Sequence, residues 1–364
     1  MTKEEYWFWL CTSTDIFRED VRRILDIYKT PEAVFEADKE ELFQRLLITE
    51  KQKIGLEESA KSRAFQDQLG RIKEDGIRFL YPESPDYPEK LKLIPDAPYS
   101  LYVKGRLPDP ALPSVGMVGA RACSEYGSAM AMRFSKAMGK NGVQVISGMA
   151  LGIDGISAKG AMEGGGKTFA VLGCGVDVIY PAQNFSLYYE IVASGGGIIS
   201  EYPIGTPAVA WQFPARNRII SGLSDRLLVF EAKKRSGTLI TVRYALDQGK
   251  DVYALPGRLT DKTSESCNLM IADGAGILIS PERLLSEIFK KDIREEQPAF
   301  PEINLEASVK LIYDLLDVTP SSVQNLAEKS GLPASKVSII LTELVLTDLA
   351  KEVSKNFYVK TLKI

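Results

Sequence analysis

The chain has 364 residues, 45% of them hydrophobic and 26% charged, a composition typical of a globular protein with two or three domains. The absence of histidine excludes catalysis by a histidine base, and four cysteines without CxxC spacing argue against a zinc site or a disulfide framework. No apolar stretch reaches the roughly 18 residues of a membrane span, so we expect a cytoplasmic protein, with no metal or cofactor.

The first 77 residues are expected to form a small helical domain. Residues 15–28 and 31–47 carry apolar residues at helical spacing, with polar and charged residues between them. Prolines then interrupt the pattern from about residue 78 to Gly105, which predicts an extended, packed connection into the next domain.

Residues 78–290 are expected to form a Rossmann-like domain. Short apolar runs alternate with helical stretches from Ser114 onward: SVGMVGA, VQVISGMA, KTFAVLG, GGIISEY, DRLLVFEA, KDVYALPG and AGILIS. Because the runs are almost continuously apolar, both faces of the sheet should be covered. The pattern therefore predicts an α/β fold, a doubly wound and mostly parallel sheet with crossover helices.

A charged, proline-containing linker is expected at residues 291–305, followed by a winged-helix-like domain at residues 306–364. Three helical stretches and a hairpin pattern predict the winged helix. Its lysines and its acidic residues are equal in number from residue 304 onward. Since a module that reads a DNA groove normally carries a basic face, a protein-contact or accessory role fits this domain at least as well.

Candidate ligand-binding residues follow the apolar runs, because doubly wound sheets bind ligands at the carboxyl ends of their strands. Glycine there admits backbone amides close to a ligand, and helix N-termini add partial positive charge, which favours a phosphate. For any one of these glycines a tight turn is the better explanation, but five glycine-containing strand ends together favour a ligand site. The candidates are Gly119, Arg121, Ser147, Gly148, Gly152, Asp154, Ser236, Gly237 and Thr238.

A basic segment between residues 216 and 258 adds further candidates, with nine lysines and arginines against four acidic residues. Pro214 suits an early helix position, which would place Arg216, Asn217 and Arg218 in a first turn, where guanidinium groups meet anionic oxygens. A second basic cluster extends the same edge of the sheet: Lys233, Lys234 and Arg235.

Two nucleotide motifs are incomplete. Residues 163–168, EGGGKT, look like the end of a P-loop, but Ala161 replaces its first glycine and the stretch precedes a strand. Residues 172–178, LGCGVDV, have Val178 where GxGxxG requires its last glycine, so NAD and FAD are not expected.

The ordered set YPESPDYPEKL, VGAR, SGMALGID, YPAQN, SEYP, FPARNRIISGLS, VFEA, SGTLIT and LPG resembles the DNA-processing protein A (Smf) family of bacteria, over about residues 80–285. The resemblance implies a non-catalytic protein that binds and protects incoming single-stranded DNA, forms a dimer and helps load the RecA recombinase in natural transformation. It also implies that the family's phosphate-pocket motifs fall on Arg121, on Ser147, Gly148 and Asp154, on residues 216–218 and on residues 236–238. Two positions depart from the family pattern: Ala158 replaces a histidine and Ser266 replaces a glycine.

Two alternatives to DNA binding remain open at this point. One is a nucleotide-phosphate-binding enzyme similar to the lysine-decarboxylase-like phosphoribohydrolases, although Thr241 stands where their PGGxGTxxE motif has its glutamate. The other is an adaptor whose helical front and neutral tail hold partners while DNA contact is incidental.

Overall fold

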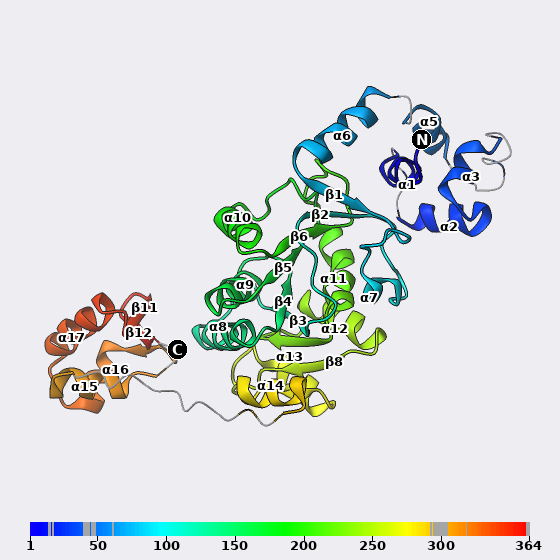
Figure 1. Cartoon of the computed structure of the whole chain (residues 1–364). Coiled ribbons are helices and arrows are strands. Elements are labelled where there is room, and N and C mark those ends of the chain that lie inside the picture. The colour runs from blue at the N-terminus through cyan, green and yellow to red at the C-terminus, as the bar shows by residue number, and fades with distance from the viewer. Residues whose placement is uncertain are drawn as a thin grey trace.

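The computed structural model describes residues 1–13, 16, 18–38, 44, 49–59, 62–291, 293, 305–317 and 319–361 (Figure 1). Its N-terminal part is helical, with α1 Lys3–Thr12, α2 Arg18–Tyr28, α3 Pro31–Glu36, α5 Glu50–Ser59 and α6 Arg63–Glu74. These helices do not have a separate core. Phe8 of α1 packs against Phe79 and Tyr102, with ring centroids 5.1 and 6.3 Å apart, so the front helices and one edge of the sheet form a single hydrophobic cluster.

The proline-rich stretch that follows is more regular than the sequence suggested. It contains strands β1 Ile77–Leu80 and β2 Leu101–Gly105, with the short helix α7 Glu89–Lys92 between them. β1 pairs antiparallel with β2, which pairs antiparallel with the main sheet. The predicted extended connection is therefore an antiparallel extension of the sheet, on which the front helices pack.

Seven parallel strands form the rest of the nine-stranded sheet, as the apolar runs predicted. They are β3 Ser114–Gly119, β4 Gln144–Ser147, β5 Thr168–Val171, β6 Gly197–Ser200, β7 Arg226–Phe230, β8 Asp251–Ala254 and β9 Gly276–Ile277. The spatial order is β1-β2-β6-β5-β4-β3-β7-β8-β9. The chain thus builds outward from β3 to β6, returns to the other side of β3 and continues to β9, which confirms the doubly wound fold.

Helices cover both faces of the sheet (Figure 1). One layer contains α8 Glu125–Lys140, α9 Ile153–Glu163, α10 Phe185–Ala193, which follows the 3-10 turn Ala182–Asn184, and α14 Pro281–Phe289. The other contains α7, α11 Gln212–Leu223, α12 Thr238–Asp247 and α13 Glu265–Ala272. The incomplete P-loop motif is the turn between the end of α9 and the start of β5.

Asp225 fixes the start of the two central strands. Its carboxylate accepts hydrogen bonds from the backbone N–H of Ser114 (2.9 Å) and from the Ser114 hydroxyl (3.0 Å), and it pairs with the Lys90 ammonium at 2.7 Å. Burial raises the pKa of Asp225, but the hydrogen bonds from Lys90 and Ser114 outweigh this effect and leave the pKa below its ordinary value.

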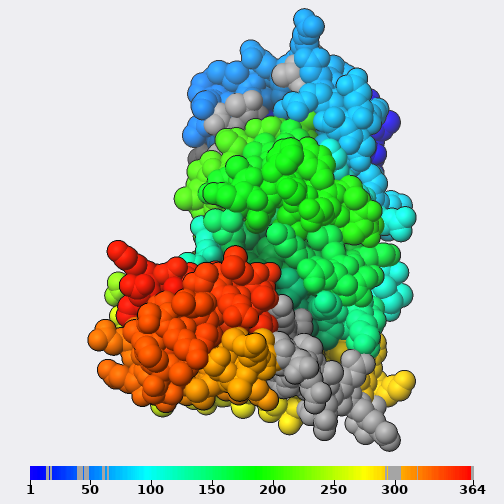
Figure 2. Space-filling model, turned by 90° about the vertical axis from the view of Figure 1, so that its left-hand side faces the viewer, coloured from blue at the N-terminus to red at the C-terminus, as the bar shows by residue number. Residues whose placement is uncertain are grey.

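The C-terminal part confirms the predicted winged helix, with α15 Ala307–Leu315, β10 Ser321–Ser322, α16 Val323–Ser330, α17 Ala334–Leu346, β11 Ala350–Ser354 and β12 Phe357–Lys360. It has its own hydrophobic core. Most of the predicted linker, residues 291–305, lies outside the described residues. Two exposed ion pairs join the winged helix to the Rossmann-like part, Arg258 with Asp317 and Lys351 with Glu125. Figure 2 shows the face of the molecule on which the winged helix, in orange and red, lies.

Among the described residues, no helix combines the length and the apolar character that crossing a membrane requires.

Candidate nucleic-acid interface

A cavity of about 670 Å³ opens at the carboxyl edge of the sheet, where the chain order reverses between β3 and β7. The loop after β3, the loop after β7 and the first half of α11 form its walls. This is the position at which doubly wound sheets bind ligands, because the two loops diverge there and leave an opening. We call it the switch-point cavity.

The structure brings most of the candidate residues together in this cavity. Its lining includes Gly119, Arg121, Asp154, Arg216, Asn217, Lys233, Arg235, Ser236, Gly237 and Thr238. These positions span more than a hundred residues of sequence. They converge because β3 and β7 are hydrogen-bonded neighbours with Gly119 opposite Phe230.

Three exposed cations line the cavity, in addition to the buried Arg216. The side chains of Arg121, Lys233 and Arg235 are exposed and come from the loops after β3 and β7. The Arg121 guanidinium lies 5.8 Å from the centroid of the Phe213 ring, within the range of a cation–π contact. The remaining faces of these groups are accessible, so they can meet an anion from solution.

Two helix N-termini also point toward this region. α12 begins at Thr238 beside the cavity and α11 begins at Gln212, and neither has an acidic residue in its first turn. The N–H groups at these helix starts already have acceptors in the protein: that of Thr238 donates to the Ser236 hydroxyl (3.2 Å), those of Leu239 and Ile240 to the carbonyl oxygens of Ser236 and Gly237, and that of Gln212 to the carbonyl oxygen of Val209. The helix ends therefore favour a negatively charged ligand through their partial positive charge.

Arg216 reaches the cavity but is 4% exposed and is held mainly by the protein. Its guanidinium donates to the carbonyl oxygens of Gly148 (2.8 Å) and Val171 and to the side chain of Asn217 (3.0 Å). Burial lowers the pKa of Arg216, although the negative charge of Asp154 opposes the shift. Arg216 therefore sets the shape and charge of the cavity floor and presents little surface to a ligand.

Arg218 does not lie in the switch-point cavity, which corrects the expectation that it faces the same anion as Arg216. It is 1% exposed, and its guanidinium forms a double hydrogen bond with the Glu201 carboxylate, both at 2.7 Å. It also donates to the carbonyl oxygen of Asp96 at 2.7 Å. Burial lowers the pKa of Arg218, but Glu201 more than offsets this and raises it. The anionic partner of Arg218 is thus inside the protein.

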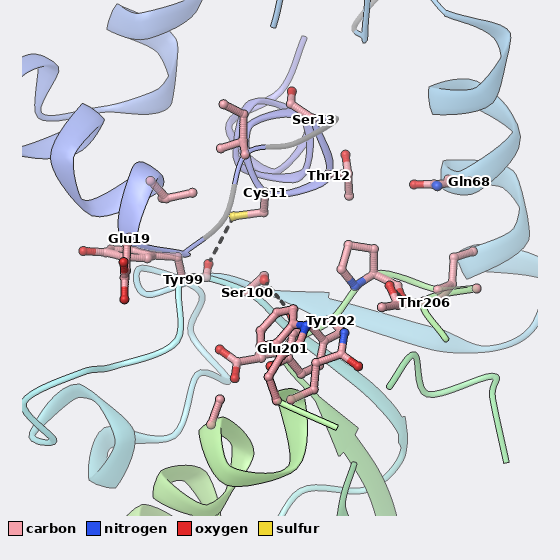
Figure 3. A pocket seen from close by; sticks show the side chains of 18 residues that line it. Cys11, Thr12, Ser13, Glu19, Gln68, Tyr99, Ser100, Glu201, Tyr202 and Thr206 are labelled. Atoms are coloured by element: carbon pink, nitrogen blue, oxygen red, sulfur yellow. Dashed lines mark hydrogen bonds between the residues drawn. The ribbon is translucent and has the colours of Figure 1, made fainter. Parts of the chain in front are cut away.

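Glu201 borders a second cavity of about 450 Å³ between the front helices and the other side of α11. Figure 3 shows Cys11 and Thr12 of α1 on one side and Glu201 and Tyr202 on the other. Burial raises the pKa of the Cys11 thiol to about 12, so the thiol is neutral. Because its described lining contains no lysine or arginine, this front cavity is unsuited to a phosphate.

α11 also begins earlier than the position of Pro214 suggested. The helix starts at Gln212, so Arg216 and Arg218 lie beyond its first turn and are not part of its N-terminal anion site. This corrects the placement of residues 216–218 in a first turn.

Four other candidates lie outside the described lining of the switch-point cavity, and three have packing roles. Ser147 is fully buried and donates to the carbonyl oxygen of Asp154 (3.3 Å). A Cβ added to Gly148 would lie 2.1 Å from the Arg216 guanidinium. A Cβ added to Gly152, whose φ is +73°, would lie 2.4 Å from the carbonyl oxygens of Ala120 and Arg121. These glycines are required by close packing rather than by a ligand. Lys234 lies 3.8 Å from Glu265.

Aromatic residues at the cavity are the feature that the sequence reasoning missed. Phe213 and Tyr180 line it, with ring centroids 5.3 Å apart and planes at 33°. Both residues lie inside motifs already noted in the sequence, FPARNR and YPAQN, but only the charged and glycine residues were considered as ligand contacts there. Exposed rings next to cations are the usual combination in sites for single-stranded nucleic acid.

The cavity offers little for acid–base chemistry. Among its described lining residues, Asp154 is the one carboxylate, and it accepts a hydrogen bond from the backbone N–H of Gly148 at 3.0 Å. Burial raises the pKa of Asp154, against the positive charge of Arg216. Thr241 also lines the cavity and is buried, so the position of the phosphoribohydrolase glutamate carries a hydroxyl. The described residues contain no group of three or more potential metal ligands.

Comparisons with known proteins agree with this geometry. A family model described as DNA recombination-mediator protein A matches residues 78–289, and a model of the DprA winged helix domain matches residues 296–353. The chain belongs to the DNA recombination-mediator protein A family. Protein Smf of Escherichia coli is 34% identical over 299 residues, which cover 78% of each chain.

Further relatives match a shorter part of the chain. DNA processing protein DprA of Streptococcus pneumoniae is 41% identical over 201 residues, covering 55% of this chain and 71% of that protein. Protein Smf of Synechocystis is 42% identical over 215 residues, 58% of this chain and 54% of the relative. The chain therefore matches only about half of the Synechocystis protein.

Two solved structures of the family share the fold. The X-ray structure of DNA processing protein A from Streptococcus pneumoniae superposes with a TM-score of 0.64 at 32% identity, covering 79% of this chain and 98% of that one. The structure of DNA processing protein A from Helicobacter pylori, described for its single-stranded DNA binding mode, superposes with a TM-score of 0.52 at 28% identity. It covers 58% of this chain and 96% of the Helicobacter pylori chain.

Proposed function

We propose that the protein binds single-stranded DNA, with phosphates of the strand in the switch-point cavity. The observation that carries this proposal is the convergence of three exposed cations, Arg121, Lys233 and Arg235, on one cavity at the reversal of strand order. The N-terminus of α12, which has no acidic residue in its first turn, supports the same ligand through its partial positive charge. Backbone phosphates are the anions that such a site binds without regard to sequence.

Phe213 and Tyr180 favour a single strand over a duplex. Their rings lie at the cavity beside the cations, where unpaired bases of a bound strand can stack on them. Duplex bases are already stacked on each other and do not present their faces. We therefore infer a preference for single strands with little sequence specificity.

We propose further that the protein acts by binding and not by catalysis. Asp154 is the one carboxylate among the described lining residues, and Thr241 replaces the glutamate of the phosphoribohydrolase motif. The phosphoribohydrolase alternative is accordingly not favoured. Release of free base from a nucleoside monophosphate, lost in the Arg121→Ala variant, would contradict a binding-only role.

The biological role that we propose follows from family membership. Relatives are named DNA processing protein, and the Helicobacter pylori relative is described for binding single-stranded DNA. On this basis the chain is a cytoplasmic homodimer that protects incoming single-stranded DNA and helps load RecA recombinase on it during natural transformation. Sedimentation of the full chain, alone and with RecA, tests the dimer and the partnership.

A salt titration of oligonucleotide binding tests the DNA site. The full chain is required, because removal of the front helices would expose Phe79 and Tyr102. Each phosphate contact with a single strand adds about 0.7 to the slope of log affinity against log salt. We expect Arg121→Ala and Lys233→Ala each to weaken binding and lower this slope by about 0.7.

Arg283→Ala provides the matched control, because it removes an exposed arginine of α14 that pairs with Glu287 outside the described lining of the cavity. Binding by this variant should equal that of the wild type. Wild-type binding that does not depend on salt, or that is equally strong for duplex and single strand, would refute the proposed site.

A further inference from the structure

Two aromatic side chains on α10 are exposed to solvent next to each other. Phe185 and Tyr189 are 54% and 51% exposed, with ring centroids 5.0 Å apart and planes at 59°. They lie one helical turn apart on the same side of α10. Single exposed apolar residues are common on protein surfaces, but a close pair of large rings is a candidate contact surface.

This pair adjoins the wall of the switch-point cavity. Tyr180 and Ala150 line the cavity, and the 3-10 turn Ala182–Asn184 connects Tyr180 directly to Phe185. The Asn184 side-chain amide donates to the carbonyl oxygens of Met149 (2.9 Å) and Ala150 (3.2 Å). These hydrogen bonds fix the start of α10 against the loop after β4, so the rings are held at a set position relative to the cavity.

The surface is also electrically suited to a strand that leaves the cavity. Residues 182–189 carry no charged side chain, and Glu190 ends this uncharged stretch. The first turn of α10 contains no acidic residue, so its N-terminus adds partial positive charge near Phe185. The cations Lys233 and Arg235, in contrast, follow β7 on the other side of the sheet edge.

The carboxyl edge is thus divided by chemistry, with cations in the loops after β3 and β7 and rings after β5 toward α10. The half-buried Phe213 lies at the boundary, next to Arg121. A single strand has the same division, since its phosphates are anionic and its bases present flat apolar faces. The aromatic part contains two ring pairs, Phe213 with Tyr180 and Phe185 with Tyr189.

We propose that Phe185 and Tyr189 form a second base-stacking subsite, which binds bases of the same strand beyond the switch-point cavity. This inference rests on the proposed DNA binding. It adds the path of the bound strand, which runs from the loop after β7 across the cavity to the start of α10. The occupant is unpaired nucleobases of any sequence, because every base has a face that stacks.

Binding of oligothymidylates of increasing length to the full chain tests the proposal. Stacking contacts contribute about 1–3 kcal/mol per base by alanine substitution, or roughly 5-fold to 150-fold in affinity. We expect Phe185→Ala and Tyr189→Ala each to weaken binding of long oligonucleotides about 10-fold and to leave the salt slope unchanged. Short oligonucleotides that fill only the cavity should bind as they do to the wild type.

Two further variants separate stacking from other effects. Phe185→Tyr retains a flat ring and should bind as the wild type, whereas Phe185→Leu retains apolar character without a ring and should bind as weakly as Phe185→Ala. Phe357→Ala, which removes an exposed ring from the winged helix, is the matched control and should bind normally. Because these rings are exposed, the melting temperature of each variant should stay close to that of the wild type.

Fluorescence of 2-aminopurine placed at single positions of the oligonucleotide gives an independent measurement. Quenching by stacking on Phe185 should occur at one or two positions outside the cavity-bound segment and disappear in Phe185→Ala. If the wild type binds in a salt-dependent manner that needs Arg121, but the two alanine variants bind all lengths normally and quench as before, this inference alone fails. If the wild type does not bind single strands, both proposals fall.

Discussion

Replacement of Arg218 by alanine separates the two possible roles of the arginines in FPARNR. The guanidinium is 1% exposed, and its double hydrogen bond to Glu201 is flanked by the Asp96 carboxylate, 3.6 Å from its Nε. Removal of the arginine leaves the Glu201 carboxylate, 8% exposed, without its cation. The variant should therefore lose stability and retain the switch-point cavity.

The size of the effect follows from the burial of the pair. Breaking a buried ion pair by removing one partner costs about 3–5 kcal/mol, because a charge stays buried without compensation. For a domain of this size, 1 kcal/mol shifts the melting temperature by about 2–4 °C. We expect Arg218→Ala to lower the melting temperature by about 6–20 °C, measured by circular dichroism, with salt-dependent DNA binding retained below the transition.

A paired replacement provides the control. Arg218→Met together with Glu201→Leu removes both charges and should recover most of the lost stability, because apolar residues of similar volume often replace a buried pair at little cost. A melting temperature of Arg218→Ala within about 2 °C of the wild type, combined with loss of DNA binding, would refute the reasoning and return Arg218 to the DNA site.

Three other predictions concern a glycine pair, a carboxylate and the winged helix. Gly148→Ala should destabilise the protein by about 1–3 kcal/mol, because the added Cβ would meet the buried Arg216 guanidinium. Gly237→Ala is the matched control: no atom lies within 4 Å of its added Cβ, so the free energy of unfolding, measured by thermal denaturation, should change by less than about 0.5 kcal/mol. Asp225, whose pKa is lowered in the folded protein, should contribute about 1 kcal/mol to the free energy of unfolding after screening. This contribution is complete above the ordinary pKa of 3.8 and is lost as the pH falls through the lower pKa of the folded protein. The free energies of unfolding of the wild type and of Asp225→Asn, measured by urea titration, should therefore become equal at that low pH. Arg258→Gln should leave the melting temperature unchanged, because its pair with Asp317 is exposed, but should increase the distance between labels on the winged helix and the sheet.

The parallel sheet was predictable because its strands are buried on both faces. Apolar runs such as SVGMVG and RLLVF appear where the burial is continuous, and each matches a strand. β1 and β2 were missed for a related reason. They are short strands among prolines, and their place in the sheet depends on contacts with the front helices and β6 that lie far away in the sequence.

The charged candidates were harder to assign, because the sequence shows which residues are charged and not which way they point. Lys233, Lys234 and Arg235 are consecutive, yet Lys234 lies outside the described lining of the cavity and close to Glu265. The role of Gly148 was also hidden, since the guanidinium that fills its space comes from a residue 68 positions later in the chain. Such packing constraints appear only when distant segments are brought together.

The arginines of α11, in contrast, could have been separated from the sequence alone. An α-helix turns about 100° per residue, so residues two apart point in nearly opposite directions and cannot share a ligand. Once FPARNRIISG is taken as helical, Arg216 and Arg218 must lie on different faces, and the structure places one against the switch-point cavity and the other against Glu201. Two basic residues at this spacing in a helix therefore have different surroundings, here a cavity floor for Arg216 and a buried carboxylate for Arg218. Which arginine has which role depends on the acidic partner, here a glutamate at the end of β6.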